Sequence, residues 1–269
     1  MQSALASKSI VIIGGTTGLG LSAARACTKC GARVVVVGRS AESVARAAGE
    51  LGSTAVAMVG DAIDSATAIE AVGRAKEAFG RFDALYHVAG GSGRQWGDGP
   101  LHELTDDAIT QTLALNLTSL IKSNRAAVQA FLSDGTSGVV LNMGSVLGVS
   151  PAPHFFATHT YAAAKSAIIG FTKSCASYYA SSNIRLNVIA PALVATPMSK
   201  RAIDNTDIEQ YLGSKQPLCG GRFGAPQDLD GAVVFLLSDA SRYLTGQVIA
   251  VDGGWSVSEG QIPSEGHDG

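Results

Sequence analysis

Short runs of β-branched and other apolar residues alternate with longer helical patterns along this chain. The first run, residues 10–13, leads into a glycine-rich turn and then a helical pattern over about 19–30. This alternation predicts a parallel sheet built from βαβ units. Further strands are expected at residues 33–37, 55–59, 84–88, 138–142, 184–189 and 248–251, and further helices at about 41–51, 66–79, 105–132, 161–179 and 227–237.

The predicted strands are almost uniformly apolar, which is typical of strands that are buried on both faces. The sequence therefore predicts an α/β fold, a Rossmann-type doubly wound parallel sheet of about seven strands with helices on both faces. No repeat, linker or change of composition divides the chain, so we expect one domain over residues 1–257, which must then hold any functional site, and a flexible tail over 258–269.

Composition and charge exclude several classes of partner. Of the 269 residues, 46% are hydrophobic and 16% are charged, and a net charge of −2 provides no basic surface for nucleic acid. The apolar runs fall far short of the roughly 20 residues that cross a bilayer, and the N-terminus lacks the pattern of a secretory signal. We therefore expect a cytoplasmic protein with no nucleic-acid or membrane partner.

The cysteines give no sign of a metal centre. Four of them are consistent with a reducing compartment. Cys27 and Cys30 form a C-x-x-C pair, but they fall inside a predicted helix and no second pair of ligands follows at metal spacing. We expect a structural role for both and no metal site.

Tyr161 and Lys165 stand four residues apart in a predicted helix and therefore share a helix face. An ammonium beside a phenol favours the phenolate, but moving a phenol pKa from about 10 to about 7 needs roughly 4 kcal/mol. A partly desolvated Lys165 together with a second positive charge, such as an oxidised nicotinamide ring, could supply it. The spacing alone is equally that of an ordinary exposed pair.

The turn after the first strand predicts a dinucleotide site. Its glycines at positions 14, 18 and 20 occupy the junction between that strand and the next helix. Glycine permits positive φ angles and close approach of a pyrophosphate, while the helix N-terminus offers unpaired N–H groups.

The second and third strands end on residues that bear on the choice of cofactor. Where a free ribose 2′-hydroxyl usually meets an acidic residue, this chain has Arg39 and Ser40. Charge-assisted hydrogen bonds from Arg39 to a 2′-phosphate favour NADP(H) as the cofactor. The alternatives are that the cofactor is NAD(H) and that Arg39 is only an exposed arginine in a turn. Asp61 could accept a hydrogen bond from an adenine amino group or cap the next segment.

Taken in order, these residues resemble the motif series of the short-chain dehydrogenase/reductase family. The late segment over residues 224–254 resembles that family as well, so the resemblance covers nearly the whole chain. The positions that carry it are the glycine turn, Asp61, Ala89-Gly90, Asn116, Ser145, Tyr161 with Lys165, and the segment from Pro191 to Thr196.

The resemblance implies a role for each catalytic residue. Tyr161 would be the general acid or base, and Lys165 would lower its pKa and bind the nicotinamide ribose. Ser145 would polarise the substrate oxygen and Asn116 would hold a water in a proton relay, although Ser145 could instead cap a turn and Asn116 could brace strands. The implied cofactor residues are Gly14, Thr16, Thr17, Gly18, Leu19, Gly20, Arg39, Ser40, Asp61, Ala62, Ala89, Gly90, Tyr161, Lys165, Pro191, Val194 and Thr196.

The chain departs from the family pattern in two notable places. Ile13 stands where the family usually has Thr, and His87-Val88 replaces the two asparagines before Ala89-Gly90. Those amides often tie neighbouring strands together, so His87 either compensates for them or leaves the brace absent. We expect a buried histidine.

The substrate is expected to be a small secondary alcohol or its ketone, bound in a partly aromatic pocket. No arginine cluster is evident that would demand a phosphate or carboxylate group. The resemblance implies an oxidoreductase that forms a homotetramer or homodimer, and Arg39 favours NADP(H) as its cofactor. The alternatives are an NAD(H)-dependent dehydrogenase and a catalytically silent sensor or scaffold. The pocket residues we expect are Trp96, His154, Phe155, His159 and Met198, with Phe156 and Tyr211 close by.

Overall fold

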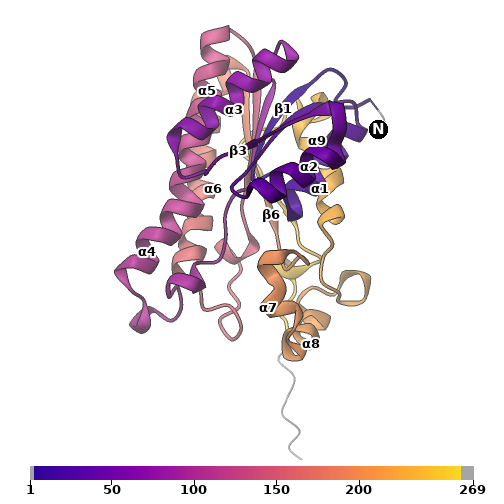
Figure 1. The fold of residues 1–269 in the computed structure, drawn as a ribbon. Coiled ribbons are helices and arrows are strands. Elements are labelled where there is room, and N and C mark those ends of the chain that lie inside the picture. Colours follow the sequence, from indigo (N-terminus) through magenta and orange to yellow (C-terminus); the bar gives the residue numbers. More distant parts are fainter. Residues whose placement is uncertain (1–2, 262–269) are drawn as a thin grey trace, which may run out of the picture.

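A single parallel sheet forms the centre of the computed structural model, which describes residues 3–261 (Figure 1). Its seven strands are ordered β3-β2-β1-β4-β5-β6-β7, as expected for a Rossmann-type doubly wound fold. The strands are β1 (Ser9–Ile13), β2 (Arg33–Gly38), β3 (Ala55–Val59), β4 (Ala84–His87), β5 (Gly138–Met143), β6 (Ile184–Pro191) and β7 (Val248–Val251).

Helices cover both faces of this sheet. They are α1 (Gly18–Lys29), α2 (Ala41–Leu51), α3 (Ser65–Phe79), α4 (Asp106–Leu113), α5 (Ser119–Asp134), α6 (His159–Tyr179), α7 (Lys200–Ile203), α8 (Thr206–Lys215) and α9 (Asp230–Leu237).

The alternation of side chains along the central strands divides the core into two layers. Ile10 and Ile12 of β1 pack in the layer with α1, α2 and α9. Val11 and Ile13 pack in the opposite layer with α3 and α5. Because successive side chains of a strand point to opposite faces, an uninterrupted apolar run feeds both layers. Central strands β1 and β4 are buried throughout, whereas the edge strands β3 and β7 are partly exposed, since each has a neighbour on only one side.

The strand order reverses at β1, which pairs with β2 on one side and with β4 on the other. All pairings are parallel, so the carboxyl ends of the strands meet at one edge of the sheet. A crevice opens outside the strand ends at such a switch point. The turns that follow β1 to β5 therefore supply the walls of a site.

Three helical segments differ from the sequence expectation. The helix expected over 105–132 is interrupted by a π-helical turn at Ala114–Thr118, which separates α4 from α5. The helix expected over 227–237 begins with a 3₁₀ turn, Pro226–Leu229, in which Asp228 accepts a hydrogen bond from the Ala225 N–H. Helices α7 and α8 follow β6 in a stretch for which no bounds were predicted.

The end of the described chain lies against α8. Lys215 Nζ donates to the Ser258 carbonyl at 2.6 Å, and Gln261 N donates to Ser214 Oγ at 2.6 Å. The rest of the tail expected over 258–269 lies outside the described residues. Among residues 3–261 no helix has the length and apolar character to cross a membrane, and no group of three potential metal ligands occurs.

Candidate active site and dinucleotide cavity

Tyr161 and Lys165 lie in the first turns of α6, a helix of 21 residues. Lys165 is 3% exposed, and its Nζ donates to the Met143 carbonyl at the end of β5 at 2.9 Å. The same nitrogen lies 5.5 Å from the centre of the Tyr161 ring. Burial disfavours the charged form and lowers the pKa of Lys165 to about 8. Lys165 is thus buried and Tyr161 is partly buried, unlike an ordinary exposed pair.

Ser145 lies two residues beyond β5 and faces Tyr161. Burial raises the pKa of the Tyr161 phenol above its usual value, and a hydrogen bond with the Ser145 side chain lowers it in part. Ser145 Oγ also accepts from Leu147 N at 3.2 Å, so the serine caps a turn as well as contacting the tyrosine. Burial therefore disfavours the Tyr161 phenolate, and the hydrogen bond with Ser145 favours it.

Asn116 lies in the π-helical turn between α4 and α5, an interruption that often occurs at functional sites. Its amide pairs with Gly91 in both directions: Oδ1 accepts from Gly91 N at 3.1 Å, and Nδ2 donates to the Gly91 carbonyl at 2.9 Å. Nδ2 also donates to the Thr112 carbonyl. The side chain therefore braces the loop after β4 and not the strands themselves.

Gly90 brings Asn116 and Lys165 into one cluster. A Cβ atom at position 90 would lie 2.8 Å from Asn116 Oδ1 and 3.5 Å from Lys165 Nζ. Only glycine leaves room for both side chains at this point of the loop. The four residues expected to be catalytic therefore lie together, around Gly90 and the first turn of α6.

Asp98 was missed by the sequence reasoning. It is buried in the glycine-rich segment after β4, and its carboxylate accepts from Thr160 N and Tyr161 N, each at 2.9 Å. The N-cap residue of α6, Thr158, makes no capping hydrogen bond with its side chain. Asp98 therefore supplies the cap from another element, 62 residues away in sequence, at a distance that no local capping pattern reveals.

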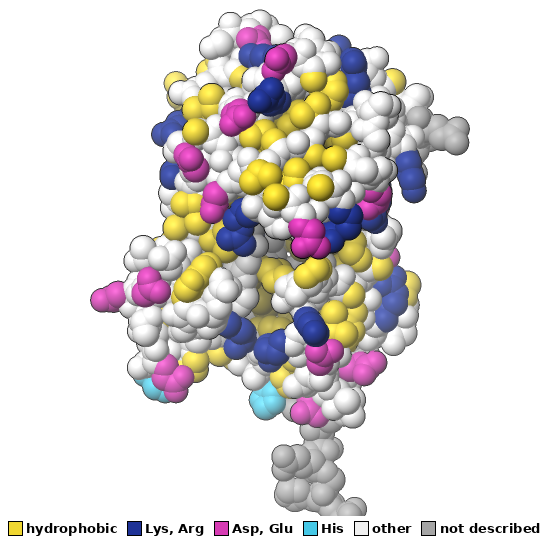
Figure 2. Space-filling model, in the orientation of Figure 1, with side chains coloured by type: hydrophobic (Ala, Val, Ile, Leu, Met, Phe, Trp, Pro, Cys, Tyr) yellow, Lys and Arg dark blue, Asp and Glu magenta, His cyan; other side chains and the backbone are white. Residues whose placement is uncertain are grey.

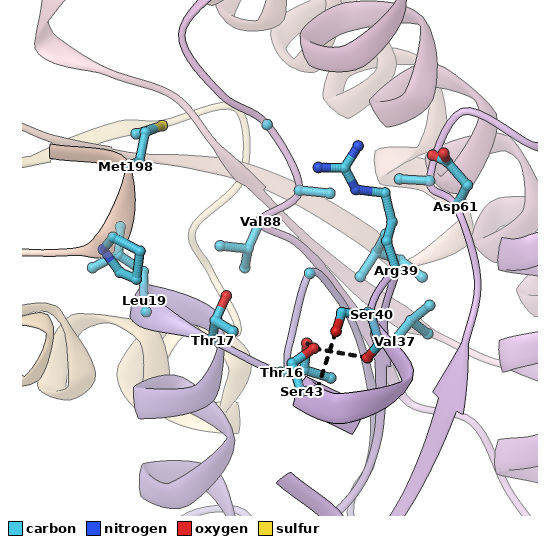
Figure 3. A pocket seen from close by; sticks show the side chains of 18 of the residues that line it. Thr16, Thr17, Leu19, Val37, Arg39, Ser40, Ser43, Asp61, Val88 and Met198 are labelled. Carbon is cyan, nitrogen blue, oxygen red and sulfur yellow. Dashed lines mark hydrogen bonds between the residues drawn. The ribbon is translucent and has the colours of Figure 1, made fainter. Parts of the chain in front are cut away.

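A cavity of about 420 Å³ follows the carboxyl ends of β1 to β4 (Figure 3). Most residues expected to bind the cofactor line it: Gly14, Thr16, Thr17, Gly18, Leu19, Arg39, Ser40, Asp61, Ala62, Ala89, Gly90 and Thr196. Gly20, Tyr161, Lys165, Pro191 and Val194 do not line it. Gly20 instead lets α1 approach β1, since a Cβ there would lie 2.0 Å from the Gly14 carbonyl oxygen.

The start of α1 suits the pyrophosphate of a dinucleotide. Gly14 and Gly18 have positive φ angles of 86° and 49°, which glycine adopts without strain. The N-cap residue, Thr17, makes no capping hydrogen bond with its side chain, so the N–H groups of the first turn remain available to an anion. A Cβ at Gly14 would come within 2.7 Å of Ala89 N and push apart the floor of the cavity.

Arg39 extends from the end of β2 into the space between Asp61 and Val88 (Figure 3). No ion pair within residues 3–261 involves it. Ser40 caps α2 by accepting from Ser43 N, and Thr16 shares a hydrogen bond with Ser43. Asp61 both lines the cavity and accepts from Ile63 N at 3.0 Å, so it also holds its own turn.

A second cavity, of about 480 Å³, adjoins the first and contains the catalytic residues at its wall. It shares Arg39, Gly90, Leu115 and Met198 with the dinucleotide cavity and is lined further by Ser145 and Tyr161. Of the five residues expected in the substrate pocket, Met198 lines it. Trp96, His154, Phe155 and His159 are not among its lining residues, whereas Phe156 and Trp255 are.

His87 is fully buried at the end of β4 and takes over a bracing role. Its Nε2 lies 3.1 Å from the Ala89 carbonyl oxygen, and its Nδ1 lies 2.6 Å from Ser123 Oγ on α5. Burial, aided by the charge of Lys165, lowers the pKa of His87 to about 3. The ring is therefore neutral, with Nε2–H donating to the carbonyl and Nδ1 accepting from the hydroxyl. Of the two options considered from the sequence, compensation matches these contacts.

Comparison with known proteins decides the family. A family model described as enoyl-(acyl carrier protein) reductase matches residues 14–256. The chain belongs to the short-chain dehydrogenase/reductase family. It is 32% identical over 259 residues to a cis-4-hydroxycyclohexanecarboxylate dehydrogenase from Sinomonas cyclohexanicum, covering 96% of this chain and 100% of that protein.

Two further similarities agree with that family. An L-rhamnose 1-dehydrogenase (NAD(P)(+)) from Azotobacter vinelandii is 32% identical over 264 residues, which cover 94% of this chain and 98% of the relative. A solved structure assigned as a short-chain alcohol dehydrogenase from Sinorhizobium meliloti 1021 superposes with a TM-score of 0.86 at 29% identity, over 96% of this chain and all of that one. This short-chain dehydrogenase/reductase is an oxidoreductase that acts between CH–OH and C=O groups with NAD(P).

Proposed function

We propose that the protein is an NADP(H)-dependent oxidoreductase that interconverts a secondary alcohol and its ketone, with Tyr161 as general acid and base. The observation that carries this proposal is the placement of Tyr161 and Ser145, hydrogen-bonded to each other, at the wall of a cavity that adjoins the dinucleotide cavity. A bound nicotinamide dinucleotide supplies or accepts the hydride.

The proton is handled by Tyr161. In oxidation, its phenolate takes the hydroxyl proton of the alcohol while the hydride leaves the same carbon, and the C–O bond becomes a carbonyl. In reduction, the phenol returns that proton to the oxygen as hydride reaches the carbon. Ser145 donates a hydrogen bond to the substrate oxygen and stabilises the negative charge that develops there.

Tyr161 needs help to become a phenolate, because its burial raises its pKa. Lys165 is charged below its pKa of about 8 and lies 5.5 Å from the ring. An ammonium at this distance favours the phenolate, and a second positive charge in the adjoining cavity adds to its effect. Asn116 contributes by holding the Gly91 loop that separates the two cavities.

The preference for NADP(H) is assigned to Arg39 and tested by binding. Arg39 lines the dinucleotide cavity where the second strand ends, and its planar guanidinium suits a phosphate. We expect tighter binding of NADPH than of NADH, and Arg39→Ala should weaken NADPH binding at least tenfold with little effect on NADH. Arg46→Ala, an exposed arginine on α2 outside the cavity, is the matched control. Tighter binding of NADH by the parent protein would refute the assignment.

The catalytic role of Tyr161 is tested with a panel of ketones and alcohols, following nicotinamide absorbance. Tyr161→Phe should abolish turnover and keep NADPH binding, whereas Tyr243→Phe, at a fully exposed position, should change neither. Wild-type turnover in Tyr161→Phe would exclude the mechanism. Cofactor binding by the parent without turnover of any compound would favour a silent sensor.

A homo-oligomer is also part of the proposal. Large apolar side chains stand exposed on α5 and at the end of α6, among them Ile121, Leu132 and Tyr178. Self-association would cover such surface. Light scattering coupled to size-exclusion chromatography tests it, and a monomer at micromolar concentration would contradict it.

A further inference from the structure

Two arginines far apart in the sequence meet at the wall of the catalytic cavity. Arg94 lies in the 3₁₀ turn Gly93–Trp96 and Arg201 lies in α7. The Nη2 atoms of both donate to the Phe155 carbonyl oxygen, at 3.1 Å and 3.4 Å. Both side chains line the cavity that also holds Ser145 and Tyr161. The expectation that no arginine cluster faces the substrate is therefore overturned, because the fold joins residues that the sequence separates.

Neither arginine is neutralised by an acidic partner. No ion pair within residues 3–261 includes Arg94 or Arg201. Arg94 is an exposed residue, and its partial desolvation lowers the pKa of its guanidinium, as does the charge of Arg201, while Asp98 acts in the opposite sense. The carboxylate oxygens of Asp98, however, already accept from Thr160 N and Tyr161 N. Two like charges are thus held close together by a neutral carbonyl.

The hydrogen-bonding capacity of the pair is largely unused within the described chain. Each guanidinium carries five N–H donors, and the one partner they share is the Phe155 carbonyl oxygen, which has two lone pairs. An anionic group entering the cavity could receive several charge-assisted hydrogen bonds at once. Such bonds would also relieve the repulsion between the two cations.

Much of the remaining cavity wall is apolar, although Ser92, Gln95, Thr158 and Ser199 also line it. Its other walls include Val146, Leu147, Phe156, Leu193 and Trp255. Figure 2 shows a hollow in the middle of this face, with hydrophobic surface next to it and Lys or Arg side chains beside it. A compound with an apolar body and one anionic end matches this division, since the body would cover the apolar walls and the acid would meet the arginines.

We propose that Arg94 and Arg201 form a carboxylate-binding site and that the substrate is an apolar oxo acid or the corresponding hydroxy acid. This inference rests on the proposed function, because it places the reacting carbonyl or hydroxyl at Tyr161 and the carboxylate at the arginine pair. Arg39 lines both cavities and is assigned to the cofactor, so it is tested separately. Arg94 and Arg201 act in substrate selection and not in the proton transfer.

The test compares ketones that differ only in charge. Methyl ketones with a terminal carboxylate, such as 5-oxohexanoate and 7-oxooctanoate, are assayed beside their uncharged amides with NADPH. We expect a kcat/KM at least tenfold higher for the acids. Arg94→Gln combined with Arg201→Gln should lower kcat/KM for the acids about tenfold or more and leave the amides unchanged. Arg94→Lys combined with Arg201→Gln should restore part of the difference in kcat/KM between acids and amides. Arg74→Gln, on exposed α3, should leave kcat/KM unchanged for both.

Binding without turnover separates this proposal from the proposed function. Hexanoate and octanoate cannot be reduced, and their binding is measured by calorimetry in the parent and in the double glutamine variant, whose folding is checked by its melting temperature. Equal kcat/KM for acids and amides, or binding of hexanoate and octanoate that the double variant retains, would overturn the carboxylate site. Absence of turnover for every ketone, with carboxylate binding lost in the double variant, would overturn the proposed function and leave the site standing.

Discussion

The carboxylate of Asp98 holds the backbone N–H of Tyr161, the residue assigned to proton transfer, at 2.9 Å. Its second oxygen holds the N–H of Thr160 at the same distance. These two bonds fix the first turn of α6, whose own N-cap side chain makes no such bond. A negative charge at a helix N-terminus is also favourable to the helix dipole. Asp98 is therefore a positioning residue for Tyr161, acting through the backbone.

Asp98→Asn should lower both activity and stability. An amide nitrogen cannot accept from an N–H group, so one of the two bonds and the charge are lost, at a cost of about 1 to 3 kcal/mol in the free energy of unfolding. Because the first turn of α6 then loosens, we expect kcat to fall about tenfold or more while NADPH binding is retained. Denaturant unfolding and steady-state kinetics measure the two effects.

A matched control separates positioning from simple capping. Asp64 caps α3 by accepting from Ala66 N at 2.9 Å and does not line either cavity. Asp64→Asn should cost a fraction of the stability lost in Asp98→Asn and leave kcat unchanged. If Asp98→Asn loses stability but keeps the kcat of the parent, Asp98 stabilises the helix without positioning Tyr161.

Gly90→Ala tests the packing that joins Asn116 to Lys165. The new methyl group would lie 2.8 Å from Asn116 Oδ1, and that side chain cannot give way easily because three hydrogen bonds hold it. We expect a loss of about 1 to 3 kcal/mol in stability together with a lower kcat. Circular dichroism melts and ketone reduction rates provide the measurement.

The control for Gly90 is another glycine with open space around it. A Cβ at Gly73, in the middle of α3, would meet nothing within 4 Å. Gly73→Ala should stabilise the protein by about 0.5 to 1 kcal/mol, since alanine favours the helix, and should not alter turnover. Unchanged activity in Gly90→Ala would show that the cluster tolerates displacement of Asn116.

The order of elements could be read from the sequence because it depends on local patterns. Apolar runs such as residues 55–59 and 248–251 coincide with strands β3 and β7, and the glycine turn at Gly14 lies where the dinucleotide cavity begins. The interruption of the predicted helix at Asn116 was not visible, because it is accompanied by hydrogen bonds to Gly91 in a distant loop. No local periodicity records such a contact.

The candidate site shows the same division. Tyr161, Lys165 and Ser145 could be found from spacing and resemblance, and the structure brings them together. Asp98 and the pair of Arg94 and Arg201 could not, since each contacts a segment far from it in the sequence. The substrate pocket was predicted poorly for a related reason, because which aromatic side chains face the cavity depends on how the loops pack on one another.

His87 makes the protein more sensitive to acid than it would otherwise be. Its pKa is about 3 in the folded state, chiefly because of burial, and about 6.5 when unfolded. Between these values the unfolded chain binds one more proton, so the contribution is fully present above pH 6.5 and is lost as pH falls towards 3. The expected extra loss between pH 6.5 and 4.5 is about 2 to 3 kcal/mol.

Replacing His87 should remove this dependence on pH. His87→Asn places at that position the residue that the family usually has, and an amide does not titrate. Urea unfolding at several pH values should give a flatter acid limb for the variant, whatever its absolute stability. His102→Asn, at a largely exposed position, should keep the slope of the parent. If His87→Asn loses stability with falling pH as steeply as the parent, the His87 ring of the parent is protonated in the folded state.

Lys165 affects stability in the alkaline range, and it affects activity while its ammonium is charged. Burial gives it a pKa of about 8 in the folded state, against about 10.5 when unfolded. Between these values the unfolded chain again binds the extra proton, so stability rises as pH rises from 8 to 10.5, by up to about 3 kcal/mol. Lys165→Met should remove this rise and also abolish most turnover, because the charge near Tyr161 is gone.

The change in the free energy of unfolding with pH separates the effect of the Lys165 charge from the effect of its other contacts. Methionine leaves the Met143 carbonyl without its partner, which costs about 1 to 3 kcal/mol at every pH, so absolute stabilities of parent and variant can be similar. The change between pH 8 and 10.5 is free of that offset. Lys173→Met, an exposed lysine on the same helix, should retain both the rise and the activity. If stability still rises between pH 8 and 10.5 in Lys165→Met, another group is responsible for the rise. The ammonium beside Tyr161 would then not titrate in this range.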